Sequence, residues 1–221
     1  TRIISSEIEH KAVLSTVKVL CKDCVDIEYV TINEFGEVDL NHLEELLSNS
    51  DKKTLVSLMH ANNEIGTLND LKAIGDGCKE HGALFHSDTV QSIGLIPIDF
   101  SDLNVNSAAA SSHKFYGPKG VGFLYVKQGT SLVCHTHGGS QERGMRPGTE
   151  NVAAIIGMAA ALKYCTDNLD KKAAHLWSLK DAMKTKMQAR IPSVNFNGDT
   201  GRGSSLPTVL NIAPPCPEGD A

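Results

Sequence analysis

A lysine, a carboxylate and an amide stand where three buried segments of this sequence end. Lys114 comes soon after the segment 107–111, Asp88 closes the segment 83–88, and Asn63 follows a third segment upstream. A lysine amine can form a Schiff base with an aldehyde, and a buried carboxylate can keep a proton on a ring nitrogen. Ligands of parallel α/β sheets bind beyond the carboxyl ends of the strands. These residue types therefore predict a site for an aldehyde carried on a nitrogen heterocycle.

Pyridoxal phosphate (PLP) combines an aldehyde, a pyridine nitrogen and a phosphate group. Lys114 would hold the aldehyde and Asp88 would keep the pyridine nitrogen protonated, and the interval between them is long enough for one connection and one strand. The remaining groups need hydrogen-bond partners, which nearby polar residues could supply: Ser111 and the amides around Ser112 and His113 for the phosphate, and Asn63 and Gln91 for the ring hydroxyl.

Each of these residues taken alone has a simpler structural explanation. Asp88 could cap the helix that follows it, and His113 and Lys114 could belong to a solvated loop. His10, in the first turn of a predicted helix, could simply be exposed to solvent. It is the combination at neighbouring strand ends that favours a cofactor site.

The elements that would position these residues alternate between strands and helices. Apolar runs and alternations predict strands at 2–5, 25–29, 54–60, 83–88, 107–111 and 120–127. Apolar residues at helical spacing predict helices over 8–21, 40–47 with Asp39 as its cap, 68 to a stop at Gly82, 151–167 and 170–190. Strand–helix–strand units of this kind imply a mainly parallel sheet flanked by helices. One further strand is predicted over 208–213, within a segment rich in Gly, Pro and Ser.

Composition excludes some classes of protein. The chain has 221 residues, 41% of them hydrophobic, and a formal net charge of −5. The sequence contains no run of Lys and Arg that would indicate binding to nucleic acid or to an acidic membrane. The longest apolar stretch, 152–162, is about half of what a bilayer-spanning helix requires, and no signal pattern begins the chain. We expect a soluble, cytoplasmic protein.

The six cysteines are scattered and do not indicate a disulfide framework. Cys21 and Cys24 form a C-x-x-C at the end of a predicted helix. A zinc site would need a second pair at matching spacing, and a redox motif would need the pair at a helix start. We therefore expect two reduced cysteines and no metal.

Five motifs, in order and in spacing, carry a resemblance to a known family. The segments EHKAV (9–13), MHANNEIG (59–66), DTVQS (88–92) and SSHKFYGPKG (111–120) resemble the class V aminotransferases. The stretch GGSQERGMRPGTEN (138–151) is similar to cysteine desulfurases of the nitrogen-fixation and iron–sulfur-assembly type. The match runs from residue 1 to about residue 162, and 204–213 resembles the start of the family's smaller domain.

The resemblance implies PLP fold type I and a homodimer. Residues 1–169 would form the PLP-binding large domain without its N-terminal part, and 170–221 a linking helix and the beginning of a smaller α+β domain. It also implies roles for individual residues: Lys114 as the Schiff-base lysine, Asp88 on the pyridine nitrogen, His10 stacked on the ring and serving as an acid or base, Asn63 and Gln91 on ring substituents, Ser111, Ser112 and His113 around the phosphate, and Thr149 reaching the phosphate of the partner subunit.

The implied reaction takes sulfur from L-cysteine. The substrate would replace Lys114 on the cofactor, and a mobile cysteine would accept the sulfur as a persulfide while alanine leaves. The sulfur would pass to an acceptor such as an iron–sulfur scaffold protein. The same motifs leave open a selenocysteine lyase, because RPGTEN (146–151) resembles those enzymes too, or another class V reaction. A non-catalytic dimerising scaffold is a third possibility.

Two departures from the family pattern affect activity. The family's Gly-Ala-Thr-Glu phosphate motif would lie upstream of residue 1, and its acceptor cysteine and carboxylate-binding arginine would lie downstream of residue 221. None of the six cysteines stands in a Ser/Gly/Ala-rich loop. Ser112 also stands where relatives often carry Gly or Ala. We therefore expect the sequence to be cut at both ends and inactive alone.

Overall fold

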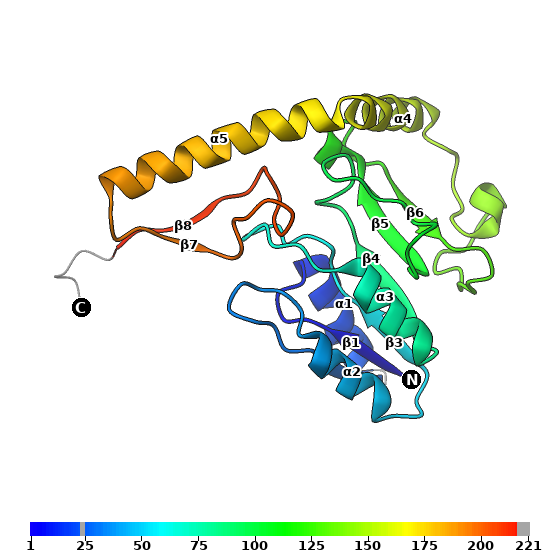
Figure 1. Cartoon of the computed structure of the whole chain (residues 1–221). Coiled ribbons are helices and arrows are strands. Elements are labelled where there is room, and N and C mark those ends of the chain that lie inside the picture. Colours follow the sequence, from blue (N-terminus) through cyan, green and yellow to red (C-terminus); the bar gives the residue numbers. More distant parts are fainter. Residues whose placement is uncertain (23–24, 216–221) are drawn as a thin grey trace.

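The computed structural model describes residues 1–22 and 25–215, and a six-stranded sheet forms its centre (Figure 1). The strand order is β2-β1-β3-β4-β5-β6. The strands are β1 (Arg2–Ser5), β2 (Asp26–Tyr29), β3 (Thr54–Ser57), β4 (Leu84–Asp88), β5 (Ser107–Ser111) and β6 (Gly122–Val126). The first five run parallel, and β6 is antiparallel to β5. The predicted mainly parallel α/β sheet is thus confirmed.

Helices connect these strands, and short polar residues fix where they start. The helices are α1 (Lys11–Lys22), α2 (Leu40–Ser48), α3 (Leu71–Glu80), α4 (Val152–Asp167) and α5 (Leu169–Arg190), with 3-10 turns η1 (Ser112–Phe115) and η2 (Gln141–Gly144). The Asp39 carboxylate accepts hydrogen bonds from two amides of α2, which confirms the predicted cap. Asp70 caps α3 in the same way. Gly82, just after α3, has a φ of +65°, the conformation that lets glycine end a helix.

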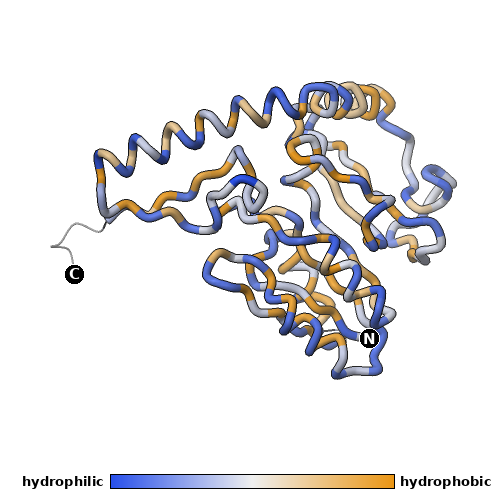
Figure 2. The backbone as a smooth tube through the Cα atoms, viewed as in Figure 1, coloured by the Kyte–Doolittle hydropathy of each residue, from blue (hydrophilic) through white to orange (hydrophobic). Residues whose placement is uncertain are grey.

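The largest apolar core lies between one face of the sheet and two helices. Val56, Phe85 and Ala108 project from β3, β4 and β5 onto Leu43 of α2 and Ile74 of α3. The chain reverses direction along the sheet at β2, so right-handed crossovers place α1 on the opposite face. Helix α5 reaches beyond the sheet, and Figure 2 shows hydrophilic and hydrophobic residues alternating along it.

The face that carries Asp88 is covered less completely. Leu84 of β4 is 45% exposed, and Leu124 and Val126 of β6 are 53% and 37% exposed. In the part of the chain that the structure describes, β6 pairs with β5 alone and so forms the edge of the sheet. An edge strand offers unpaired backbone hydrogen-bonding groups along one side.

The segment after α5 differs from the sequence prediction. A single strand was predicted over 208–213, but a hairpin-like pair forms from β7 (Asn195–Asn197) and β8 (Asn211–Ala213). The loop between them is tied to the loop after β3, because Leu68 N donates to Ser204 O (2.9 Å) and Leu206 N donates to Gly66 O (2.7 Å). The predicted strand is thus confirmed over residues 211–213, and its partner β7 was missed because a strand of only three residues carries little apolar pattern.

The structure also bears on the absence of a long apolar helix and on the C-x-x-C motif. No helix within the described ranges is long and apolar enough to cross a membrane. Cys21 is exposed near the C-terminal end of α1, whereas Cys24, its partner in the C-x-x-C motif, falls outside the described residues.

A buried lysine fastens α5 to the loop that precedes β8. Lys180 is 5% exposed, and its Nζ donates to Ser205 Oγ (2.9 Å) and to Leu206 O (2.8 Å). Burial, reinforced by the nearby Lys184 ammonium, lowers the pKa of Lys180 to about 8. In the unfolded chain this pKa is about 10.4.

The shift of Lys180 predicts a rise in stability at alkaline pH. Between pH about 8 and about 10.4 the unfolded chain binds more protons at this residue than the folded chain, so the free energy of unfolding rises with pH in that window. We expect Lys180→Met to lose this rise relative to wild type in denaturant titrations from pH 7 to 9.5. Lys186→Met, an exposed lysine of the same helix, is the matched control. Parallel curves for wild type and Lys180→Met would contradict the prediction.

Candidate cofactor site

The candidate site forms where the sheet changes the direction of its winding. The chain moves outward in opposite directions from β1 and β3, and such a switch point opens a crevice beyond the carboxyl ends of the strands. The loops after β1, β3, β4 and β5 meet there. They carry His10, Asn63, Asp88 and Lys114, four of the residues that the sequence singled out.

Asp88 is held at the end of β4 by pairing with β5. It lies opposite Ala109, and Thr89 fixes the next residue because both its amide and its hydroxyl donate to Ala109 O, at 3.1 and 2.9 Å. Asp88 Oδ1 accepts a hydrogen bond from Val90 N (2.9 Å). The carboxylate thus caps the turn that follows β4, which is the structural role that the sequence also allowed for it. It remains partly exposed on the face of the sheet that carries Leu84 and Leu124.

Lys114 is presented by a tight turn directly after β5. Within η1, Ser112 and Phe115 are fully buried while His113 and Lys114 are exposed. Tyr116 then adopts a left-handed conformation (φ 67°), and Gly117 N donates back to Ser112 O (3.0 Å). The buried side chains of Ser112 and Phe115 anchor the turn. Lys114 is exposed and forms no ion pair in the described part of the chain.

Gly117 is required by this turn for a steric reason. A Cβ at this position would lie 2.0 Å from Ser112 Oγ, which is buried. We expect Gly117→Ala to lower the free energy of unfolding by about 1–3 kcal/mol, the typical effect of an overpacked interior. In a Ser112→Ala background the same change should have a much smaller effect in chemical denaturation, because the clashing oxygen is gone. Equal losses in both backgrounds would disprove this explanation.

The three residues predicted around a phosphate are not equivalent. Ser111 Oγ and His113 Nδ1 are hydrogen-bonded to each other at 2.8 Å, at the exposed start of the turn. Ser112 is fully buried, its amide donates to Val121 O (3.1 Å), and its hydroxyl has no partner among the described residues. The structure brings Ser111 and His113 to the surface beside Lys114 and leaves Ser112 behind them.

A second carboxyl group lies close to Asp88, and the sequence analysis missed it. Glu9 is buried, and its Oε1 accepts hydrogen bonds from Met59 N (2.7 Å) and Ser6 Oγ (3.3 Å), while Oε2 has no partner among the described residues. Burial, with a contribution from the Asp88 charge, raises the pKa of Glu9 to about 7. Glu9 ties the loop after β1 to the end of β3 and so fixes where the neighbouring His10 stands.

His10 and the two amide residues occupy loops around this carboxyl pair. His10 is exposed, and its Nδ1 accepts from Ala12 N (3.2 Å) in the first turn of α1. The buried amide is Asn62, whose Oδ1 accepts from two amides of its own loop and whose Nδ2 donates to Ile8 O (3.0 Å). Asn63 is thereby left partly exposed, as is Gln91 after β4. His60 N donates to Asp88 O (3.0 Å) and joins the loop after β3 to β4.

Thr149 stands apart from the other predicted residues. It is exposed in the segment between η2 and α4, and no hydrogen bond among the described residues links it to Asp88 or Lys114. The predicted role for Thr149 is to reach the phosphate of a partner subunit. A single chain does not test that role, which stays a prediction.

The residues present fit the cofactor that the sequence predicted. An exposed lysine amine, a carboxylate one strand away, and a hydroxyl–imidazole pair beside the lysine supply the groups that an aldehyde, a ring nitrogen and a phosphate require. The unpartnered Oε2 of Glu9 adds a buried polar atom near the carboxylate. This α/β sheet, with such residues at its strand ends, is the large-domain fold of PLP enzymes of fold type I.

Comparison with known proteins identifies the family. The family model for class-V aminotransferases matches residues 1–213, and the chain belongs to this family. It is 41% identical over 211 residues to "Cysteine desulfurase IscS" of Clostridium botulinum, covering 96% of this chain and 53% of the relative. The protein of the same name from Dictyoglomus turgidum is 41% identical over 219 residues, with 99% and 55% covered.

Solved structures give the same result. A "NifS-like protein" superimposes with a TM-score of 0.90 at 37% identity, covering 96% of this chain and 57% of that chain. A NifS-like protein from Rickettsia africae gives a TM-score of 0.88 at 36% identity, with 97% and 58% covered. The chain spans about half the length of the curated relatives it matches.

Proposed function

We propose that the protein carrying this sequence is a PLP-dependent cysteine desulfurase, which releases L-alanine from L-cysteine and passes the sulfur on as a persulfide for iron–sulfur cluster assembly. The observation that carries the proposal is the pair formed by Lys114 after β5 and Asp88 at the end of the adjacent β4. The 41% identity to proteins named cysteine desulfurase supports this choice among class-V reactions.

PLP supplies an electrophilic aldehyde and an electron sink when it is bound. Lys114 would hold it covalently, and Asp88 would keep a proton on its ring nitrogen because the opposite charges stabilise each other. His10 would lie against the ring, Asn63 and Gln91 would hydrogen-bond its substituents, and Ser111 and His113 would donate to its phosphate. Ser112 would support this turn from behind, and Thr149 would reach the phosphate held by a partner subunit in a homodimer.

The described cysteines differ in how well they could accept sulfur. Cys78 and Cys165 are buried, and burial raises the pKa of Cys78 to about 12, so its nucleophilic thiolate is scarce at neutral pH. Cys21 is exposed at the far end of α1, and Cys134 is partly exposed. We therefore propose that the acceptor thiol comes from outside the described residues, and that an acceptor protein in the cytoplasm takes the sulfur onward.

The division of the chain follows from the same proposal. Residues 1–169 would belong to the PLP-binding large domain, and 170–221 would contain the linking helix and the start of the smaller domain. The tie between Lys180 and the loop before β8 supports a firm connection between α5 and that smaller part.

Product analysis of the complete protein tests the proposed reaction. Incubation with L-cysteine should yield alanine and persulfide sulfur in equal amounts. Release of selenide from selenocysteine without activity on cysteine would favour a selenocysteine lyase, and a keto acid would favour transamination. A folded dimer without visible cofactor absorbance would favour the scaffold instead.

A chain limited to these 221 residues should behave differently. It lacks residues that the family pattern places around the phosphate and the substrate carboxylate, so we expect weak PLP binding and no turnover of cysteine. Titration with PLP followed by absorbance, together with an alanine assay, measures both properties. Measurable alanine release from this chain would refute the prediction.

A further inference from the structure

The turn that carries Lys114 closes on a residue in an unfavourable backbone conformation. Tyr116 has a φ of 67° and a ψ of 14°, in the left-handed region that a bulky side chain rarely adopts. The chain bends back there, and Gly117 N donates to Ser112 O (3.0 Å). Glycine would adopt this conformation at little steric cost. A tyrosine persists in it only where surrounding contacts hold it, and such residues gather at functional sites.

Helix α5 provides a contact of this kind. The Lys172 ammonium lies over the Tyr116 ring, 4.2 Å from its centroid, which is within the range of a cation–π interaction. Lys172 Nζ also lies 3.9 Å from Cys165 Sγ, which is buried in α4. Lys172 forms no ion pair among the described residues, so no carboxylate there competes with the ring for this cation. Because Tyr116 is 69% exposed, the contact with Lys172 is a large part of what holds its ring.

The preceding residue of the turn is held by α4. Phe115 is fully buried, and its carbonyl oxygen accepts a hydrogen bond from Cys165 Sγ (3.5 Å). Phe115 and Cys165 belong to one apolar cluster, against which Met158 and Leu162 of α4 pack. The end of α4 and the start of α5 therefore meet the turn at two successive residues. The buried contact depends on packing, whereas the exposed one depends on the single cation of Lys172.

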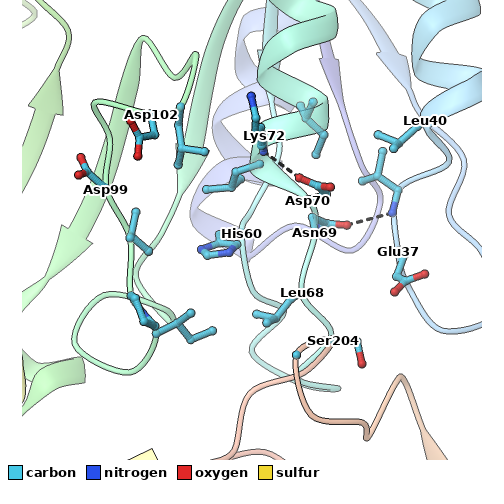
Figure 3. Close-up of a pocket in the computed structure, with 18 residues that line it drawn as sticks. Glu37, Leu40, His60, Leu68, Asn69, Asp70, Lys72, Asp99, Asp102 and Ser204 are labelled. Carbon is cyan, nitrogen blue, oxygen red and sulfur yellow. Dashed lines mark hydrogen bonds between the residues drawn. The ribbon is translucent and has the colours of Figure 1, made fainter. Parts of the chain in front are cut away.

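About two turns further along, α5 is tied to a different loop. Lys180 Nζ donates to Ser205 Oγ (2.9 Å) and to Leu206 O (2.8 Å). The neighbouring Ser204 O accepts from Leu68 N (2.9 Å) in the loop after β3. Figure 3 shows Leu68 and Ser204 beside each other, where both line a cavity of about 640 Å³. Helix α5 thus joins the loop after β3 to the turn after β5.

We propose that Lys172 and Tyr116 form a clasp through which helix α5 keeps the Lys114 turn closed and fixed relative to the loop after β3. Both are positioning residues, because they act through the placement of Lys114. The value of the clasp for the reaction rests on the proposed function, whereas its effect on the turn does not. Since Asn63 follows β3, the clasp also fixes the distance between two of the loops that bear the candidate site.

Hydrogen exchange of the Gly117 amide in the complete protein, prepared without PLP, measures how often the turn opens. Lys172→Met removes the cation and keeps an aliphatic side chain, so exchange should become about two- to fivefold faster, the factor typical of an exposed cation–π contact. Lys172→Arg keeps a cation and should restore the wild-type rate. Lys171→Met, on an exposed lysine of the same helix, is the matched control. Equal exchange in wild type and Lys172→Met would overturn the clasp.

A double-mutant cycle shows whether the two residues act together. Tyr116→Leu keeps a bulky residue at the left-handed position and removes the ring, so Gly117 exchange should again become faster. In that background Lys172→Met should have no further effect. Effects that simply add would mean that Lys172 acts without the ring, and the proposal would then be wrong.

A second measurement concerns the hold of the turn on the cofactor. Loss of bound PLP, followed as the decay of visible absorbance after dilution, should be about two- to fivefold faster in Lys172→Met, because Lys114 is released more easily from an open turn. Lys172→Arg and Lys171→Met should behave like wild type. Faster Gly117 exchange with unchanged PLP loss would refute the positioning role. A wild-type protein in which PLP does not attach to Lys114 would instead overturn the proposed function, and the exchange result would stand.

Discussion

Replacing Lys114 with alanine is expected to abolish covalent attachment of PLP and to reduce alanine production in the complete protein by at least about 100-fold. A primary amine is needed to form the carbon–nitrogen bond to the cofactor, and the exposed turn η1 presents Lys114 for it. Because Ser112 and Phe115 anchor the turn, the substitution should leave the thermal stability nearly unchanged.

The measurement combines visible absorbance with chemical trapping. Borohydride reduction of the wild-type protein followed by peptide mass spectrometry should place the added cofactor on Lys114, and the variant should show neither the label nor the absorbance band. Lys127→Ala, an exposed lysine just after β6, is the matched control. A label on another lysine in the wild-type protein would remove Lys114 from its proposed role.

The second large effect is expected from Asp88→Asn. Asparagine keeps an oxygen that can accept the hydrogen bond from Val90 N, so the turn after β4 should survive while the negative charge is lost. An opposite charge nearby typically stabilises a protonated group by about 1–3 pKa units. The ring nitrogen of bound PLP should therefore lose its proton at a correspondingly lower pH, and alanine production should fall strongly.

The pH dependence of cofactor absorbance separates this effect from a general loss of structure. Wild type and Asp88→Asn are compared at equal PLP occupancy, with Asp51→Asn as the control for removing one negative charge. An Asp88→Asn protein with wild-type absorbance and turnover at every pH would show that another group protonates the ring, and Glu9 would be the next candidate because it is buried close to Asp88.

Local pattern was sufficient to predict most of the sheet and the loops that bear the site. Strand 107–111 was predicted with its observed bounds, and Asp39 was recognised as a helix cap from its place before an apolar stripe. Strand 54–60 was predicted longer than β3, which ends at Ser57. Beyond that residue, Leu58 N and His60 N still donate to His86 O and Asp88 O of β4. The extended path is therefore close to the predicted one.

What the sequence could not predict depends on contacts between distant residues. In the sequence, Glu9 looks like an ordinary charged residue before a helix. In the structure it is buried and accepts a hydrogen bond from Met59 N, 50 residues away, which no local pattern predicts. β7 has three residues, two of them asparagine, and only its pairing with β8 makes it a strand. The 2.9 Å contact between His60 Nδ1 and Ser92 Oγ likewise joins residues from two different loops.

The open edge of the sheet has a practical consequence for handling the chain. Leu124 and Val126 are exposed on β6, whose outer side pairs with no further strand in the described chain. A strand of a neighbouring molecule can pair with such an edge, so aggregation at high concentration is expected to begin at β6 rather than at the charged helices. Biophysical work on this polypeptide is best done dilute, with light scattering as a routine check.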